Sequence, residues 1–179
     1  IAKERAERAR RAEQARRAAA AARVAAAAAA ARTAGGGSST GGASAASTTA
    51  SSGTSYGTVA GAAAAISYAR EQIGKPYVWA AAGPDTFDCS GLTMRAWQAG
   101  GVSLPHYSVA QWDRVKTVDL DDLRAGDLVF FATSKTNPAT IYHVGLYIGG
   151  GQMIEAPYTG ENVRISSIYR ASLFGAGRP

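Results

Sequence analysis

Apolar positions recur at helical spacing in the first part of the globular sequence. One pattern with helical periodicity covers residues 59–73. It ends at a glycine with a proline just beyond, which is a common end to a helix. A second helical pattern covers residues 92–97 and stops at a glycine pair, 100–101. Residues 108–114 predict a third, short helix.

Strand patterns follow these helices. Residues 128–131 form a continuous apolar run, which predicts a strand buried on both faces. Residues 141–148 and 152–156 flank three glycines and predict a β-hairpin, and residues 163–165 predict one more strand. Helices that precede strands in this way indicate an α+β domain with an antiparallel sheet.

Two segments of different composition precede this domain. Residues 1–32 consist almost wholly of Ala, Arg, Glu and Gln and predict a helix. Residues 33–57 are rich in Gly, Ser, Thr and Ala and predict a flexible linker, so the domain is expected at 58–179. The formal net charge of +6 lies in the first segment, which carries nine Lys or Arg against three Glu, and the rest of the chain is neutral.

The basic helix allows two interpretations. It has few large apolar residues, so it is either a solvated helix or the end of an alanine-rich coiled coil with an upstream coiled-coil partner. Alternatively, it is a basic arm that binds an anionic polymer such as nucleic acid, anionic lipid or teichoic acid. No aromatic residue is interleaved for base stacking, so we favour the first interpretation and expect no nucleic-acid partner.

The single cysteine, Cys89, excludes an internal disulfide and a cysteine-rich zinc site. Neither His106 nor His143 lies at the close spacing of zinc ligands, so we expect no metal and no cofactor. No apolar run is long enough to cross a bilayer, and no signal peptide is visible at the start of the chain. We expect this sequence to be the C-terminal part of a longer protein.

Cys89 stands where a glycine-containing loop meets the second predicted helix. Asp88 occupies the expected N-cap position, which places Cys89 in the first helical turn. Helix N-terminal N–H groups and the helix dipole stabilise a thiolate and can also stabilise an oxyanion. Such a nucleophile needs an imidazole, and the two histidines are the candidates. The alternative is a buried, inert cysteine that packs as a small apolar residue.

The hairpin offers a partner for one histidine. If its loop is the three glycines, facing residues sum to 300, so that Tyr147 faces Met153 and Glu155 is a diagonal neighbour of His143. A loop of two or four residues would move Glu155 to the other face of the sheet. The even positions from 142 to 148 are apolar or aromatic and are expected to face the core.

The candidate catalytic set is therefore Cys89 as nucleophile, His143 as general acid and base, and Glu155 as the group that orients the imidazole. Gly145 is expected to leave the imidazole uncrowded. Each member also has a structural interpretation: an inert thiol, a satisfied strand histidine and an ordinary surface carboxylate. Spacing alone does not separate the two interpretations.

Five segments, in their order along the chain, resemble the NlpC family of bacterial cell-wall peptidases. They are GKPYVW (74–79), DCSGL (88–92), LP (104–105), GDLVFF (126–131) and HVGLYIG (143–149). The resemblance covers about residues 60–170 and implies a papain-like α+β fold with helices packed on an antiparallel sheet. It further implies a secreted or envelope-associated cysteine peptidase. Such enzymes cleave peptidoglycan stem peptides, typically between D-glutamate and the diamino acid, which is meso-diaminopimelate or lysine.

The resemblance also implies roles for individual residues. Cys89 and His143 would be the catalytic pair, and the Tyr77 hydroxyl would lie beside the thiol and support the oxyanion. Asp88 and Ser90 would help to bind the substrate.

Two positions depart from the common family pattern. Glu155 stands where many relatives carry histidine, although some actinobacterial relatives resemble this chain in having Glu. His106 stands where relatives often carry an arginine that would pair with a substrate carboxylate. His106 and the nearby Ser108 are therefore candidate substrate-binding residues, and the substrate that they prefer stays open. His106 also competes as general base, and we place it below His143 because only His143 lies in a matching motif.

Three classes of function stay open. The leading hypothesis is a γ-D-glutamyl endopeptidase that acts on peptidoglycan. The second is an amidase or acyltransferase that uses the same Cys–His pair. The third is a non-catalytic cell-wall-binding module in which the basic helix makes the interaction. A regulatory role, in which the helix or linker covers the cleft, is a further hypothesis.

Overall fold

A computed structural model of the protein describes residues 57–179. The chain divides into two compact units, Ile1–Ser52 and Gly53–Pro179, and the described residues lie in the second. The predicted basic helix over residues 1–32 and all but the last residue of the predicted linker, 33–57, lie outside the described residues.

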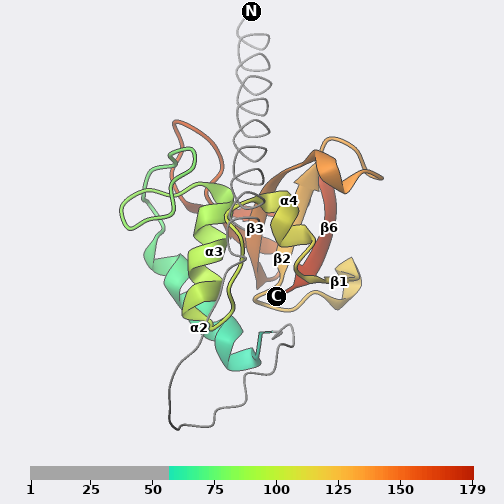
Figure 1. The fold of residues 1–179 in the computed structure, drawn as a ribbon, viewed down its shortest axis with the longest axis horizontal. Coiled ribbons are helices and arrows are strands. Elements are labelled where there is room, and N and C mark those ends of the chain that lie inside the picture. The colour runs from blue at the N-terminus through green and yellow to red at the C-terminus, as the bar shows by residue number, and fades with distance from the viewer. Residues whose placement is uncertain (1–56) are drawn as a thin grey trace, which may run out of the picture. The chain divides into compact units, whose positions relative to one another are not determined.

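Three α-helices come first in the described part of the chain, as the apolar pattern predicts (Figure 1). They are α2 (Val59–Glu71), α3 (Cys89–Ala99) and α4 (Ser108–Trp112). Thr58 is the N-cap of α2, and its Oγ1 accepts a hydrogen bond from the backbone N–H of Gly61 at 3.0 Å. Within residues 57–179, no helix combines the length and the apolar character that a membrane span requires.

Helices α2 and α3 pack against each other through a backbone contact between two glycines (Figure 1). A Cβ atom on Gly61 would lie 2.5 Å from the carbonyl oxygen of Gly100, and the reverse substitution would meet Gly61 in the same way. Any side chain at either position would push the helices apart. Gly100, the first glycine after the second helical pattern, therefore also sets the distance between the two helices.

The remaining elements form one antiparallel sheet of six strands, in the order β1-β6-β2-β3-β4-β5. The strands are β1 (Lys116–Val118), β2 (Leu128–Ala132), β3 (Ile141–Gly149), β4 (Gln152–Glu155), β5 (Arg164–Ser167) and β6 (Leu173–Arg178). Two short 3-10 turns, η1 (Leu120–Asp122) and η2 (Pro138–Thr140), lie in the connections. The α+β class with an antiparallel sheet is confirmed.

Strand β2 is buried at every position, as its continuous apolar run predicts. Leu128 and Phe130 belong to the main hydrophobic cluster, which also includes the buried hydrophobic side chains of α2 and α3. Val129 and Phe131 point to the other face and belong to a second, smaller cluster. Apolar side chains therefore cover both faces of the sheet at its centre.

The hairpin of β3 and β4 has the predicted register, although its loop differs. Tyr147 faces Met153 as predicted. Gly149 pairs with Gln152, so the loop contains only two of the three glycines, and a register shift between Tyr147 and Gly149 compensates for the shorter loop. Without this bulge, a two-residue loop would have moved Glu155 to the other face of the sheet.

The prediction that all even positions of β3 face the main core is wrong at Tyr142. The later even positions do pack in the main cluster, whereas Tyr142 packs against the second one. A shift in register causes this difference, because Phe131 pairs with His143 but Ala132 pairs with Ile141. Tyr142 is the extra residue of this bulge, and Ile141 fills the main cluster instead.

Candidate active site

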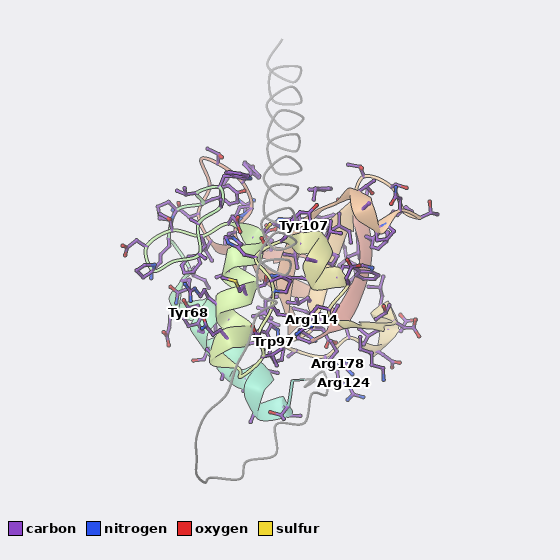
Figure 2. The ribbon with its side chains drawn as sticks, in the orientation of Figure 1. Tyr68, Trp97, Tyr107, Arg114, Arg124 and Arg178 are labelled. Atoms are coloured by element: carbon purple, nitrogen blue, oxygen red, sulfur yellow. The ribbon has the colours of Figure 1, made fainter. Side chains whose placement is uncertain are left out.

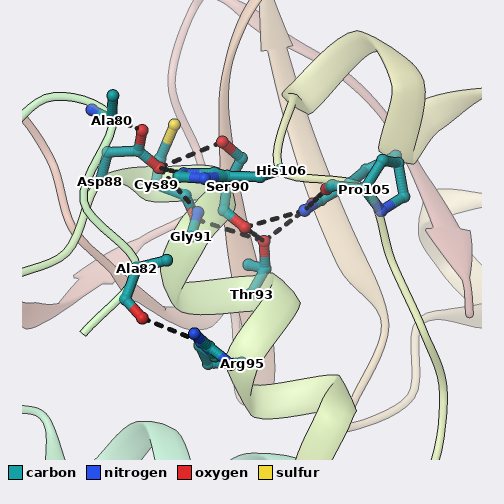
Figure 3. Close-up of polar contacts among 11 residues, drawn as sticks. Ala80, Ala82, Asp88, Cys89, Ser90, Gly91, Thr93, Arg95, Pro105 and His106 are labelled. Atoms are coloured by element: carbon teal, nitrogen blue, oxygen red, sulfur yellow. Dashed lines mark hydrogen bonds and ion pairs between the residues drawn. The ribbon is translucent and has the colours of Figure 1, made fainter. Parts of the chain in front are cut away.

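Cys89 is the first residue of α3, and its sulfur projects from the first turn beside the Asp88 side chain (Figure 3). Asp88 is the N-cap, as predicted: its Oδ1 accepts a hydrogen bond from the backbone N–H of Gly91 at 2.7 Å. The Cys89 side chain is buried, with 3% of its surface exposed. The thiol therefore lies where the helix dipole and the first N–H groups favour a negative charge.

The Asp88 carboxylate also holds the surroundings of the thiol in place. Its Oδ1 accepts a hydrogen bond from Ser90 Oγ at 3.1 Å and lies 2.9 Å from His106 Nε2. Its Oδ2 accepts a hydrogen bond from the backbone N–H of Ala80 at 2.9 Å. Ala80 has a left-handed backbone, with φ of 61°, which is unfavourable for a residue with a Cβ. Asp88 thus fixes the helix start, the preceding loop and His106 together.

Gly91 allows the preceding loop to lie directly on the first turn of α3. A Cβ atom at this position would be 2.2 Å from the carbonyl oxygen of Ala81 and 2.9 Å from His106 Nε2. The same Ala81 carbonyl accepts the backbone N–H of Asp88 at 2.8 Å. The glycine of the DCSG segment is therefore required by close packing around the thiol.

His143 and Glu155 form a buried pair beside Cys89. The distance from His143 Nε2 to Glu155 Oε2 is 2.7 Å, and both side chains are almost wholly buried. His143 Nδ1 is also buried and makes no hydrogen bond to oxygen or nitrogen, so it is the ring nitrogen left for the thiol. Burial lowers the pKa of His143, but its interactions with Cys89 and then with Glu155 outweigh burial and raise the pKa to about 9. The site therefore favours an imidazolium next to a thiolate.

Glu155 has further partners of positive charge. Arg170 donates two hydrogen bonds to it, from Nη1 to Oε2 at 2.9 Å and from Nη2 to Oε1 at 2.6 Å. Arg164 Nε lies farther away, 3.6 Å from Oε1. Burial raises the pKa of Glu155, but the hydrogen bonds from His143 and Arg170 hold it well below its usual range. Glu155 is therefore a carboxylate at any pH where the protein would work.

Asp88 and Ser90, two of the candidate substrate-binding residues, lie at the start of α3, and the others come from different segments. His106 makes its contact with Asp88 and not with Glu155, the carboxylate that binds His143. Ser108 is buried and begins α4. Tyr77 is buried, and its backbone N–H donates to the carbonyl of Glu161 at 2.9 Å.

Gln111 joins α4 to the first turn of α3. Its Nε2 donates to the backbone carbonyls of Ser90 at 2.9 Å and Pro105 at 2.8 Å, and its Oε1 accepts a hydrogen bond from Thr93 Oγ1 at 2.8 Å. The side chain is fully buried. It therefore sets the position of the segment that carries His106 relative to the helix that carries the thiol.

Sequence analysis missed Arg170 and Gln111. Both lie in stretches without a motif, and each meets its partner only through the tertiary fold. One signal was available: a buried carboxylate such as Glu155 needs a counter-charge, which predicts some basic partner without saying which. Within residues 57–179, no group of three or more His, Cys, Asp or Glu side chains is arranged to hold a metal ion.

Comparison with known proteins agrees with this architecture. The sequence profile of the NlpC/P60 family matches residues 74–174. A γ-D-glutamyl-L-lysine dipeptidyl-peptidase of Bacillus subtilis is 43% identical over 96 residues, which are 54% of this chain and 32% of that protein. The peptidoglycan endopeptidase RipA of Mycolicibacterium smegmatis is 38% identical over 110 residues, covering 54% of this chain and 21% of that protein. The chain thus spans a third or less of the length of these relatives.

Solved structures show the same fold. The crystal structure of the NlpC/p60 domain of the peptidoglycan hydrolase SagA superposes with a TM-score of 0.59 and 35% identity, and the match covers 65% of this chain and 97% of that one. The papain-like arrangement expected from the sequence is thereby confirmed as that of NlpC/P60 domains. Since the family match spans more than half of the sequence and includes Cys89, His143 and Glu155, the chain belongs to the NlpC/P60 family of cysteine peptidases.

Proposed function

We propose that this protein hydrolyses an amide bond in peptidoglycan stem peptides through a thioester on Cys89. The observation that carries the proposal is the arrangement of three groups. Cys89 lies at the start of α3, His143 has its Nδ1 free of other hydrogen bonds, and Glu155 holds the opposite ring nitrogen at 2.7 Å. A nucleophile, a proton carrier and a group that orients the carrier are what acyl transfer requires.

In the acylation step, the thiolate sulfur attacks the carbonyl carbon, and the carbonyl electron pair moves to oxygen. The N–H groups of the first turn of α3 and the Tyr77 hydroxyl are suited to stabilise this oxyanion. The imidazolium of His143 then gives its proton to the leaving nitrogen. The C–N bond breaks, an amine departs, and the acyl group remains on Cys89 as a thioester.

In the deacylation step, the now neutral His143 takes a proton from a water molecule whose oxygen attacks the thioester. The C–S bond breaks, the acid product leaves, and the thiolate–imidazolium pair is restored. Glu155 stays ionised throughout and stabilises the imidazolium in both steps. It acts through His143 and is therefore a positioning residue.

We further propose that the scissile bond joins D-glutamate to the diamino acid, meso-diaminopimelate or lysine. The names of the relatives support this choice, since one is a γ-D-glutamyl-L-lysine dipeptidyl-peptidase and another a peptidoglycan endopeptidase. Asp88 and Ser90 at the start of α3, His106 in contact with Asp88, and Ser108 at the start of α4 are proposed to bind the substrate. We therefore propose that the working protein is secreted or associated with the cell envelope, where such a substrate occurs.

The N-terminal segments fit this proposal as a tether. We propose that residues 1–32 form a helical arm, with an upstream coiled-coil partner, and that residues 33–57 give the peptidase domain at 58–179 its reach. Purified chain with and without residues 1–57 tests this role on two substrates. The shortened chain is expected to lose activity on intact cell walls and to keep it on soluble stem peptides. If the two chains cleaved intact cell walls at equal rates, the tether role would be contradicted.

The test of the activity is digestion of meso-diaminopimelate-type and lysine-type peptidoglycan, with the products identified by mass spectrometry. Wild type should release fragments with a free D-glutamyl carboxylate, and Cys89→Ala should release none. Products cut at the muramyl lactyl group would instead identify an amidase. Equal cell-wall binding by both proteins without any product would indicate a non-catalytic module.

A further inference from the structure

Arg170 reaches the buried centre of the candidate site from a surface turn. It lies between β5 and β6, and its side chain is 34% exposed, yet its guanidinium binds a carboxylate that is 0% exposed. The two hydrogen bonds to Glu155, at 2.9 and 2.6 Å, use both carboxylate oxygens. This paired geometry fixes the plane of the carboxylate as well as its charge.

A second contact connects Arg170 to the imidazole. Its guanidinium carbon lies 5.2 Å from the centre of the Phe131 ring, and the same ring lies 5.6 Å from the His143 ring. Phe131 pairs with His143 across β2 and β3 and is fully buried. Arg170 is therefore connected to His143 indirectly by two neighbours, Glu155 and the Phe131 ring.

Arg164 does not duplicate this role. Its Nε lies 3.6 Å from Glu155 Oε1, beyond hydrogen-bond length, and its Nη1 donates to Glu161 Oε2 at 2.6 Å. Its charge is thus shared with a second acidic residue. The charged or titratable groups that face Glu155 are His143 from β3, Arg164 from β5 and Arg170 from the turn, with Cys89 beyond the imidazole.

We propose that Arg170 is a positioning residue of the active site, which holds Glu155 ionised and directed at His143 Nε2. The inference rests on the proposed function, because it extends the set Cys89, His143 and Glu155 by a fourth member. The physical reason is that a fully buried carboxylate with only one donor would be costly and free to turn. An arginine fork removes both problems, and a lysine would remove only the first.

A competing explanation is that Arg170 merely fastens the turn to the sheet. The chain contains a matched control for this, since Arg178 forms the same kind of fork on another buried carboxylate. Its Nε and Nη2 lie 2.8 Å from the two oxygens of Asp127, and its side chain is 28% exposed. Asp127 precedes β2, at the end of that strand away from Phe131 and the imidazole, and Figure 2 labels Arg178 beside Arg124.

The experiment compares Arg170→Gln, Arg170→Lys and Arg178→Gln in the full chain, with kcat, KM and thermal stability measured for each. For Arg170→Gln, we expect kcat to fall about tenfold or more, but by less than the full loss of general acid–base catalysis, which contributes roughly 10²- to 10⁴-fold. Arg178→Gln should lose similar stability and keep the wild-type kcat. Equal kcat values for the two glutamine variants would overturn the proposal.

The pH profile separates charge from geometry. The pKa of Glu155 is held low partly by Arg170, so its removal raises this pKa and Glu155 takes up a proton at higher pH. The acid limb of kcat/KM should therefore move to higher pH in Arg170→Gln. In Arg170→Lys the charge remains, so the acid limb should stay near that of wild type while kcat falls. If Arg170→Gln does not fold, a wild-type kcat in Arg170→Lys alone would overturn the positioning role.

Alkylation of Cys89 by iodoacetamide keeps the two proposals distinguishable, because the chain has a single cysteine and the reaction needs no substrate. The acid limb of the alkylation rate should shift upward in Arg170→Gln and not in Arg178→Gln. A wild-type protein that cleaves no peptidoglycan but shows this shift would refute the proposed function and support the role of Arg170. An active wild type with identical profiles in all variants would refute only the role of Arg170.

Discussion

His143 Nε2 lies 2.7 Å from Glu155 Oε2, and this contact spans the two strands of one hairpin. The carboxylate is wholly buried, and the imidazole nearly so. A short contact between a buried carboxylate and an imidazole stabilises the imidazolium and selects which ring nitrogen faces the thiol. Catalysis by Cys89 would therefore depend on a residue that never touches the substrate.

Replacement of Glu155 by Gln tests this dependence. The amide keeps the size of the side chain but removes its charge, so the imidazolium loses its stabilising partner. We expect kcat to fall by about 10²- to 10⁴-fold, the range attributed to general acid–base catalysis. Steady-state kinetics on a soluble stem peptide would measure this. A rise in KM alone, with kcat unchanged, would contradict a role for Glu155 in the chemical step.

A second prediction concerns the pKa of His143. This pKa is about 9, and burial lowers it while Cys89 and Glu155 raise it. Cys89→Ala removes one of the two raising interactions, so the pKa of His143 should fall. The imidazolium thus contributes to folding stability fully below its ordinary pKa of about 6.5, and the contribution disappears as pH rises through 9.

NMR titration of the imidazole in wild type and Cys89→Ala checks the sign. In wild type, the base limb of kcat should lie near the same value of about 9, since in the proposed mechanism the imidazolium protonates the leaving amine. An unchanged pKa in Cys89→Ala would mean that the thiol does not interact with the ring.

The histidine that sequence analysis kept as a rival base has a different position. His106 Nε2 contacts Asp88 Oδ1 at 2.9 Å, and its side chain is 28% exposed. We therefore expect His106→Ala to raise KM several-fold and to leave kcat within about threefold, because in the proposed mechanism His143 carries the proton. His143→Ala is the matched comparison and should abolish turnover. A collapse of kcat in both variants to the same extent would make His106 part of the chemical step.

The sequence predicted more of the fold than of the supporting contacts, and the reason is the range of the interactions. Helix starts such as Asp88 depend on residues two or three positions away, so a local pattern is sufficient. The pairing of Tyr147 with Met153 was predicted correctly. The loop, however, is shorter than the three glycines assumed, and a bulge compensates for the difference. Bulges are not encoded in a period of two, and this is also why Tyr142 was assigned to the wrong face.

Gly145 illustrates the same limit. It was expected to leave space for the imidazole, but a Cβ atom there would lie 2.4 Å from the sulfur of Met153 on β4. The glycine therefore makes room for the opposite strand. Arg170 binds Glu155 although the two residues are 15 positions apart in the sequence, and no periodic pattern predicts that contact. Contacts of this kind become visible only when strand order and loop paths are known.

The last prediction concerns the cost of the thiol's surroundings. Asp88→Ala removes the cap of α3 and, with it, the acceptor for the strained Ala80 N–H and the partner of His106. Loss of a helix cap alone costs about 1 kcal/mol, within a range of roughly 0.5–2 kcal/mol. Loss of an acceptor for a part-buried donor adds roughly 1–3 kcal/mol. We therefore expect Asp88→Ala to lower the free energy of unfolding by more than a cap accounts for.

Thr58→Ala is the control for this prediction. Thr58 caps α2 through one hydrogen bond of 3.0 Å to Gly61 N–H and has no described contact with the candidate site. Its replacement should cost about 1 kcal/mol in urea unfolding and leave both kcat and the alkylation rate of Cys89 unchanged. Asp88→Ala should lower both rates, because the first turn of α3 and the loop at Ala80 would lose their shared anchor. If the two variants lost equal stability and kept equal activity, Asp88 would be only a helix cap, and the arrangement of the thiol would depend on Gln111 and the packing at Gly91.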